Sequence, residues 1–394
     1  MEYRPLGSLV NRKIGYGIVQ PGPSVPGGVP VIKVNNLISG LRSPSELDTT
    51  TRENDARYSR TRLRGGELLI SVVGTIGKTA IVPDAFAGCN LVRATALIDI
   101  ADALLTKWVR YYLASPSGLA YMEQNLNTTV QPTLNIKALT EMPIPLFSRA
   151  EMEKAVLVLS ALDEKIETNN KTSDNLYTQA KAIKRQWVAK SKDKYELLPL
   201  IEIAAINPDT YSPKEAWEYV NYLDTSSITN GFIADIQHIV PSSEKLPSRA
   251  RRKVSAGDVL FSMVRPNQNH FGIISDPLPN MLASTGFAAI RSKNSLVCNE
   301  LIYLCLTEWD FIEKMQQLAE QSTSTFPSIK PSDLGTCQIP CPKDESSDAF
   351  TDTLKSLFAL IAANFRENSS LATMREALLP KLMSGEIDVS AIKF

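Results

Sequence analysis

The chain has 394 residues, with 42 Lys and Arg, 42 Asp and Glu, and a formal net charge of zero. This length suits two or three domains, and no apolar run approaches the roughly 18 residues of a membrane span. The five cysteines and two histidines lack the spacing of a zinc site, and the odd number of cysteines indicates the reducing cytoplasm.

Charge is distributed unevenly along the chain. Residues 1–149 hold 16 basic and 11 acidic residues, a net charge of +5, whereas residues 195–345 hold 12 and 18, a net charge of −6. In both segments, basic residues come just before a Gly-acid pair, and we expect them to form a basic strand that leads into it. They are Arg57, Arg60, Arg62 and Arg64 in the first, and Arg249, Arg251, Arg252 and Lys253 in the second. The zero total therefore does not exclude nucleic acid as a ligand.

Residues 68–83, LLISVVGTIGKTAIVP, predict a β-hairpin and not a phosphate-binding loop. A P-loop needs a glycine where Val72 stands and a helix after the lysine, but a β-branched run ending at Pro83 follows Lys78. We therefore expect a Gly-rich turn that carries Thr75 and Lys78. The corresponding place in the second segment reads RPNQNHFG, and it offers Arg265, Asn267, Gln268 and Asn269.

These side chains suit DNA. Arg, Asn and Gln pair with base edges, while Lys and Arg neutralise phosphates. A solvated charged face is the alternative for either cluster alone, but the recurrence at the same place in both segments favours DNA contact.

Two long amphipathic helices are expected, over residues 150–194 and 346–394. Apolar positions in the first recur in steps of three and four from Met152 to Trp187, which is the seam of a coiled coil. Adding 195 gives a second seam, from Phe350 to Leu382. We expect the helices to pair, with Asn169 and Asn364 setting their register; two independent amphipathic helices are the alternative. Arg375 falls on the second seam, where local fraying would accommodate it.

The globular segments also repeat. Gln131–Pro145 aligns with Phe326–Pro340 at an offset of 195, and Gly66–Val73 aligns with Gly257–Val264 at an offset of 191. Such anchors in one order indicate two copies of one unit. The sequence thus predicts an α+β protein with a pseudo-twofold internal repeat, in which two long helices pair as an antiparallel coiled coil. Its parts are globular segments 1–149 and 195–345, a central helix 150–194, and a C-terminal helix with tail 346–394.

Catalytic constellations are not recognisable in the sequence. His238 and His270 have no evident nucleophile beside them in the sequence, and Asn207–Tyr211 and Phe86–Asn90 match methyltransferase motifs only in part. The chain is therefore predicted to bind and not to catalyse, without a metal or cofactor of its own.

With these features the chain resembles the specificity (S) subunit of type I restriction–modification systems. The resemblance covers essentially the whole chain. It rests on the two-copy layout, on GELLISVVGTIGKTAIVP, on LTEMPIPL leading into LDEKIETNN, and on the ending LLPKLMSGEIDV. In that ending, Gly385 also suits a helix C-cap.

The resemblance implies a DNA-sequence-recognition subunit with two target-recognition domains. Each would read one half of a split, asymmetric DNA site, and helix length would set the unread gap. Implied partners are two methyltransferase (M) subunits, which bind S-adenosylmethionine, and restriction (R) subunits. The second globular segment departs from the pattern, because it is acidic and lacks the Gly-Thr-Ile-Gly-Lys turn. The alternative is a non-catalytic protein scaffold with paired helices and peptide-binding heads; a solitary methyltransferase ranks last.

Overall fold

The computed structural model describes residues 1–41, 43–127, 131–322 and 327–389. The chain divides into two compact units: unit 1 comprises Met1–Ile166 and Ser369–Phe394, and unit 2 comprises Glu167–Asn368. The boundary falls inside both long helices, α6 (Arg149–Lys190) and α11 (Asp348–Ser384). Phe326, the first residue of one repeat anchor, lies outside the described residues.

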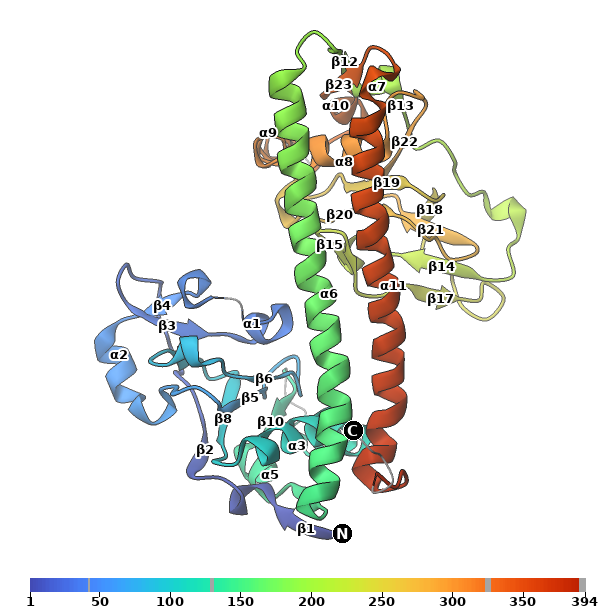
Figure 1. The fold of residues 1–394 in the computed structure, drawn as a ribbon. Coiled ribbons are helices and arrows are strands. Elements are labelled where there is room, and N and C mark those ends of the chain that lie inside the picture. The colour runs from blue at the N-terminus through green and yellow to red at the C-terminus, as the bar shows by residue number, and fades with distance from the viewer. Residues whose placement is uncertain (42, 128–130, 323–326, 390–394) are drawn as a thin grey trace. The chain divides into compact units, whose positions relative to one another are not determined.

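Unit 1 combines helices with small sheets. One sheet has the strand order β2-β8-β5-β6, and its strands are labelled in Figure 1. Another has the order β4-β3-β7, and β1 pairs with β11. Besides parts of α6 and α11, its strands and helices are β1 (Glu2–Pro5), β2 (Arg12–Tyr16), β3 (Val29–Ile32), α1 (Val34–Ser39), β4 (Thr49–Thr50), α2 (Arg52–Arg57), β5 (Leu68–Ser71), β6 (Thr79–Ile81), β7 (Asn90–Leu91), β8 (Thr95–Asp99), α3 (Ala103–Ala114), α4 (Pro116–Gln124), β9 (Leu126–Asn127), β10 (Thr133–Leu134), α5 (Ile136–Glu141) and β11 (Pro143–Leu146).

Unit 2 has the same kinds of element. Its sheets have the strand orders β13-β22-β19-β20 and β17-β14-β21-β18, and β12 pairs with β23. Its strands and helices are β12 (Tyr195–Pro199), α7 (Leu200–Ile203), β13 (Ala204–Ile206), β14 (Val220–Leu223), β15 (Ile228–Thr229), β16 (Phe232–Ile233), β17 (Gln237–Ile239), β18 (Ala250–Lys253), β19 (Asp258–Ser262), β20 (Phe271–Ile274), β21 (Met281–Ser284), β22 (Phe287–Ser292), α8 (Asn299–Leu306), α9 (Trp309–Glu320), α10 (Pro331–Gly335) and β23 (Gln338–Pro342).

The strand topology of unit 1 recurs in unit 2, as the repeated sequence anchors predict. The order β2-β8-β5-β6 corresponds to β13-β22-β19-β20, and the pair β1–β11 corresponds to β12–β23. Each unit also has one parallel pair in its second sheet, β3 with β7 and β14 with β21. The mixed α and β composition expected from the sequence is therefore present in each unit.

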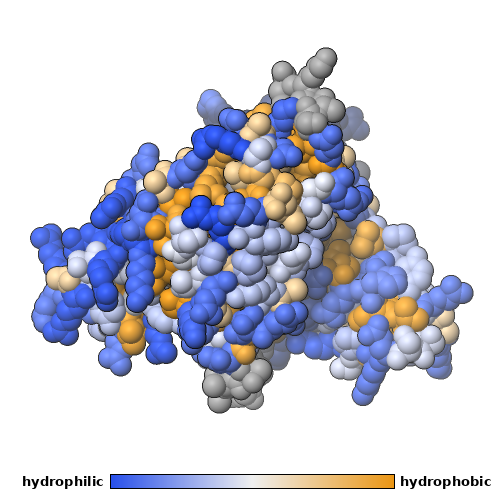
Figure 2. Space-filling model, turned by 90° about the horizontal axis from the view of Figure 1, so that it is seen from below, coloured by the Kyte–Doolittle hydropathy of each residue, from blue (hydrophilic) through white to orange (hydrophobic). Residues whose placement is uncertain are grey.

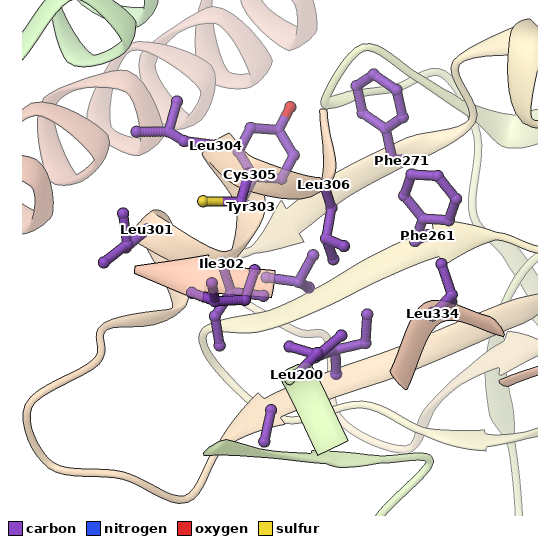
Figure 3. Close-up of a cluster of buried hydrophobic side chains, with 14 of the residues drawn as sticks. Leu200, Phe261, Phe271, Leu301, Ile302, Tyr303, Leu304, Cys305, Leu306 and Leu334 are labelled. Carbon is purple, nitrogen blue, oxygen red and sulfur yellow. The ribbon is translucent and has the colours of Figure 1, made fainter. Parts of the chain in front are cut away.

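Helices cover one face of the main sheet in each unit. In unit 2, Phe261 of β19 and Phe271 of β20 project to the same side, where their rings stack with centroids 6.0 Å apart, and the residues of α8 pack around them (Figure 3). In unit 1, Trp108 of α3 is buried, and its indole N–H donates to the carbonyl oxygen of Pro145 at 2.7 Å. Burial of such large aromatic side chains dominates the energetics of a core.

The long helices α6 and α11 contact each other within both units. In unit 2, Trp187 stacks on Phe350 with centroids 4.2 Å apart, and Asn169 donates to Asn368 at 2.9 Å. Residue numbers thus rise along α6 as they fall along α11, so the paired segments run in opposite directions. All predicted seam positions from Met152 to Trp187 and from Phe350 to Leu382 are buried or half-buried. The predicted pairing of two long helices is confirmed.

Polar side chains fill the middle of this seam. Asn169 also donates to Glu367 Oε2 at 2.8 Å, and Asn364 donates to Ser173 Oγ at 3.1 Å. The two asparagines named from the sequence therefore bond across the helix pair, each to a different residue and not to each other. A buried polar group keeps its partners only in one alignment, so these bonds disfavour any shift between the helices.

The expectation of fraying at Arg375 is wrong. The helix continues to Ser384, and the Arg375 guanidinium donates to Asp163 Oδ1 at 2.9 Å in unit 1. Asp163 also accepts from the Tyr111 hydroxyl at 2.9 Å and lies 3.4 Å from Arg110. Burial, with the neighbouring Asp163 charge, raises the pKa of Tyr111 to about 12. An ion pair therefore accommodates the charged seam residue.

We expect Asp163→Ala to lower the free energy of unfolding by about 1–2 kcal/mol, and Arg375→Ala by less than about 1 kcal/mol. The reason for the difference is that Asp163 serves three groups, whereas Arg375 is a partly exposed member of one pair. Urea denaturation followed by circular dichroism measures both changes. Equal losses in the two variants would contradict this account.

On the face seen in Figure 2, hydrophilic residues predominate at the periphery and apolar residues form separate groups between them. Scattered apolar groups are normal on water-facing protein surfaces. In the part of the chain that the structure describes, none of the helices has both the length and the apolar character required to cross a membrane.

Candidate nucleic-acid interface

A buried acid stands at the start of the equivalent strands β5 and β19. Glu67, 2% exposed, accepts hydrogen bonds from the backbone N–H groups of Arg64 at 2.8 Å and Gly65 at 2.9 Å. Asp258, fully buried, accepts from the backbone N–H of Ser255 at 2.8 Å. Each acid thereby holds the backbone conformation of the residues just before its strand.

Each acid also binds an arginine, but the arginine comes from a different strand in each unit. Glu67 binds Arg12 of β2 at 2.5 Å, and Arg12 also pairs with Asp99 of β8. Asp258 binds Arg291 of β22 at 2.7 Å, and Arg291 also pairs with Asp209 at 2.9 Å. Both acids thus serve the fold, so neither Gly-acid pair is a ligand group.

The unit 1 arginine cluster lies at the start of β5, and the predicted basic approach strand is wrong here. Arg57 ends helix α2, where it pairs with Glu53 at 2.6 Å, and Arg60 lies in the 3₁₀ turn Ser59–Thr61. Arg62 binds the buried Asp55, and this partner raises the pKa of its guanidinium. The side chains of Arg60 and Arg64 are exposed and make no hydrogen bond or ion pair to the described residues.

The predicted hairpin is confirmed, because β5 and β6 pair antiparallel across a Gly-rich turn. Ser71 holds the base of the turn: its hydroxyl accepts from the Lys78 N–H at 2.8 Å, and its carbonyl accepts from Gly77 at 3.0 Å. Thr75 and Lys78 are exposed. The Lys78 ammonium forms no ion pair within the described ranges, so it is available to an external anion.

The structure does not bring the arginine cluster and Lys78 together. Arg12 donates to the carbonyl oxygens of Arg60 at 3.3 Å and Arg62 at 3.0 Å, which ties the cluster to the start of β5. Lys78 follows the other end of this strand. At about 3.3 Å per residue, the strand separates the two by on the order of 15 Å. They are two contact regions and not one patch.

A groove that the sequence did not predict lies at the Lys78 end of unit 1. It has a volume of about 700 Å³, and Val73 of the hairpin turn, Lys33, Arg93 and Gln131 are among its lining residues. Lys33 pairs with Asp48 at 2.6 Å, whereas the exposed Arg93 has no ion pair among the described residues. Arg93 follows β7 and lies about twenty residues after Val73 in the chain. Strand pairing alone brings it beside the hairpin turn, so the sequence pattern does not predict this proximity.

In unit 2, Arg249 and the loop Arg265–Asn269 lie at the same end of β19. A Cβ on Gly286 would be 2.6 Å from the Arg249 guanidinium, and the Gly286 carbonyl accepts from Met263, just after β19, at 2.8 Å. Asn267 and Gln268 are exposed. Arg249 and these amides therefore form one polar end of the sheet.

The loop Arg265–Asn269 is held in a strained conformation. Arg265 and Asn269 have left-handed backbones with φ of 47° and 57°, and the 3₁₀ turn Pro266–Gln268 lies between them. The Arg265 N–H donates to the Pro327 carbonyl at 3.0 Å, and the Asn269 carbonyl accepts from Asn230 at 2.9 Å. Such strain persists only where surrounding contacts fix it, so the amide side chains are presented from a rigid loop.

The remaining basic residues of β18 have different environments. Lys253 pairs with Glu215 at 2.6 Å and lies 5.4 Å from the centroid of the Trp217 ring. Arg251 Nη1 and Arg252 Nε are buried without a hydrogen-bond partner in the described residues, and burial lowers the pKa of Arg252. These two nitrogens are closed to an external anion in this fold, and Lys253 already has an internal role.

Comparison with known proteins identifies relatives of the chain. Residues 1–177 match the family model of the type I restriction modification DNA specificity domain. The EcoBI specificity subunit of Escherichia coli is 26% identical over 189 residues, which are 47% of this chain and 40% of that protein. The HindI specificity subunit of Haemophilus influenzae is 24% identical over 163 residues, which are 41% of this chain and 35% of that protein. The matched stretches thus span less than half of these two relatives.

A solved structure has the same fold. It is the S subunit of a type I restriction-modification system from M. genitalium, with a TM-score of 0.53 and 17% sequence identity, covering 96% of this chain and 95% of that one. At this identity the likeness concerns the fold alone. The family model and the two curated relatives bear out the family resemblance drawn from the sequence.

Proposed function

We propose that this chain, a relative of the type I restriction enzyme specificity subunits, is the DNA-recognising and non-catalytic subunit of such a system. The observation that carries the proposal is the polar end of the main sheet in each unit. In unit 1 this end offers Thr75, Lys78 and Arg93; in unit 2 it offers Arg249, Asn267 and Gln268. Guanidinium and amide groups can read base edges, and lysine can neutralise a phosphate.

Each unit would act as one target-recognition domain, and each would read one half of an asymmetric site. The different polar ends support different half-sites, because a Gly-rich turn in unit 1 is replaced by a rigid, amide-bearing loop in unit 2. The helix pair would serve as the spacer between them in a pseudo-twofold arrangement. Its polar middle supports this role, since Asn169 and Asn364 disfavour other alignments of the helices.

The methyl transfer and cleavage reactions would belong to partners. Two methyltransferase subunits, which would hold S-adenosylmethionine, and restriction subunits would assemble with this chain, and the complex would act on DNA in the cytoplasm. A near-neutral recognition subunit suits this division, because the partners can supply much of the positive charge around the duplex.

Mapping methylated adenines across the host genome, with and without this chain, tests the proposed function. We expect one motif of two separated half-sites to lose methylation when the chain is deleted and to regain it on complementation. An unchanged methylation map would overturn the proposal. If the lost motif were one continuous site, the proposed DNA recognition would stand, but the proposal that each unit recognises a separate half-site would be rejected.

Replacing Lys78 by Ala is expected to weaken binding of the assembled complex to all DNA sequences and to reduce the slope of log affinity against log salt by about one. The reason is that a lysine at a turn contacts phosphate, which carries no sequence information. Filter binding at several salt concentrations measures both effects. Lys107→Ala, an exposed lysine of α3, is the control. An unchanged slope in the Lys78 variant would rule out the phosphate contact.

A further inference from the structure

Unit 2 contains an open groove with an apolar floor that DNA recognition does not use. It has a volume of about 580 Å³ and lies among the end of α6, β12, α9 and β23. Leu197, Phe311 and Met315 contribute apolar side chains, and Leu197 is 57% exposed. Apolar side chains that gather in a concave site, unlike apolar residues scattered singly over a surface, are typical of a binding surface.

The rim of this groove is basic. Arg185, Lys192 and Lys314 line it, and none of the three forms a hydrogen bond or ion pair through its side chain within the described ranges. By contrast, Lys184 is 5% exposed and is neutralised by Glu308 at 2.8 Å. Asp310 also lines the groove, so three cations without partners face one acid. The excess positive charge makes the rim complementary to an anionic partner.

Unit 1 shows how this chain packs an acidic and apolar segment. After α11, the chain turns at Gly385, which has a φ of 76°, and Val389 is 5% exposed in the core. Ile387 packs against the same cluster, while Glu386 lies outward, 3.7 Å from Lys381. In Glu386–Val389, therefore, apolar residues alternate with acids: the apolar side chains enter the unit and Glu386 pairs with a lysine.

The chain after α6 has the opposite character. At the offset of 195, Lys190, Lys192 and Lys194 stand where Gly385, Ile387 and Val389 stand after α11. This segment continues into β12, and Lys194 accepts a backbone hydrogen bond from Lys343 at 3.0 Å. At the same position in the repeat, unit 2 thus has a basic segment, of which Lys192 lines the groove, and unit 1 has an acidic, apolar segment.

We propose that the groove of unit 2 binds a segment of a partner protein in which acidic and apolar residues alternate. The apolar residues would pack on Leu197, Phe311 and Val188, and the acids would pair with Arg185, Lys192 and Lys314. The apolar floor favours a peptide over nucleic acid, because a phosphate backbone offers nothing to bury against leucine and phenylalanine. This inference does not rest on the proposed function.

Fluorescence anisotropy with a labelled peptide, GEIDVEIDV, tests the proposal on the full chain. We expect saturable binding that weakens with salt. The double variant Lys192→Glu/Lys314→Glu should weaken it by about tenfold or more, because both cations then repel the peptide acids. The matched control is Lys214→Glu/Lys245→Glu, which reverses two exposed lysines of unit 2 outside the groove and should leave binding unchanged.

The apolar part of the site is tested separately. Leu197→Ser should weaken peptide binding at least about threefold, whereas Leu278→Ser, which changes a leucine 44% exposed outside the groove, should not. Circular dichroism shows that the variants remain folded. Absent binding, equal binding of a GKIKVKIKV peptide, or insensitivity to both groove variants would overturn the proposal. It would also be overturned if the double lysine variant impaired duplex DNA binding but not peptide binding.

Discussion

Replacing Gly17 by Ala is expected to lower the free energy of unfolding of unit 1 by at least about 3 kcal/mol. Gly17 is buried, and a Cβ at this position would lie 1.9 Å from the carbonyl oxygen of Leu91. The obstacle is backbone, so no rotamer change relieves it. The same carbonyl accepts from Ile18 at 2.7 Å, and this bond must break if the strands separate. Urea denaturation of the purified chain measures the loss.

Gly15 provides the matched control for this prediction. It lies in β2, two residues earlier, and a Cβ there would meet only the Lys13 carbonyl, at 3.9 Å. We expect Gly15→Ala to change stability by less than about 1 kcal/mol. Ile18 lines the groove that contains Arg93, so under the proposed function Gly17→Ala should also abolish DNA binding while Gly15→Ala preserves it. Similar losses in both variants would show that the close approach at Leu91 is not what requires glycine.

Inserting one heptad into both long helices, after Ile166 and before Ser369, is expected to abolish methylation at sites with the natural gap. Under the proposed function, seven residues lengthen the spacer by about 10.5 Å, the rise of about three base pairs. Both half-sites should remain readable, because neither globular part is altered. Methylation mapping in a strain that expresses the variant should therefore find the same half-sites with a longer gap.

The same heptad inserted into α6 alone is the control. The contact of Asn169 with Asn368 and that of Arg375 with Asp163 lie on opposite sides of this insertion, so the two contacts are no longer compatible and one set of polar groups loses its partners. Each buried polar group left unpaired costs about 1–3 kcal/mol, and this variant should be unstable and inactive at every gap. If the double insertion still methylated sites with the natural gap, the spacer role would be rejected.

The features predicted correctly from the sequence are those that depend on local patterns. The hairpin of residues 68–83 follows from β-branched runs around a Gly-rich turn, and the seam from Met152 to Trp187 follows from its periodicity. The accommodation of Arg375 was not predictable in this way, because its partner Asp163 lies 212 residues away. The partner of a seam residue depends on helix pairing and not on either helix alone.

The residues available to contact DNA are also hard to predict from the sequence, because their partners in the fold lie far from them in the chain. Arg62 lies in a conspicuous arginine run, but folding pairs it with the buried Asp55. Arg93 stands alone in an apolar stretch, and only the pairing of β7 with β3 and of β8 with β5 places it in a groove. A cluster of basic residues in the sequence thus predicts an anion site. Strand pairing decides which of the basic side chains remain available to an external anion.

The arginine that binds the buried acid comes from β2 in unit 1, as Arg12, and from β22 in unit 2, as Arg291. This difference limits which recombinants of the chain can fold. A crossover that joined the first strand of unit 1, with Arg12, to the later strands of unit 2, with Arg291, would place two guanidinium groups around one acid. The reciprocal product would leave Glu67 and Asp99 without either arginine. A viable chimera must therefore inherit the main sheet of each unit intact. New specificities can then arise when a whole globular part is exchanged, but not from a crossover within its sheet.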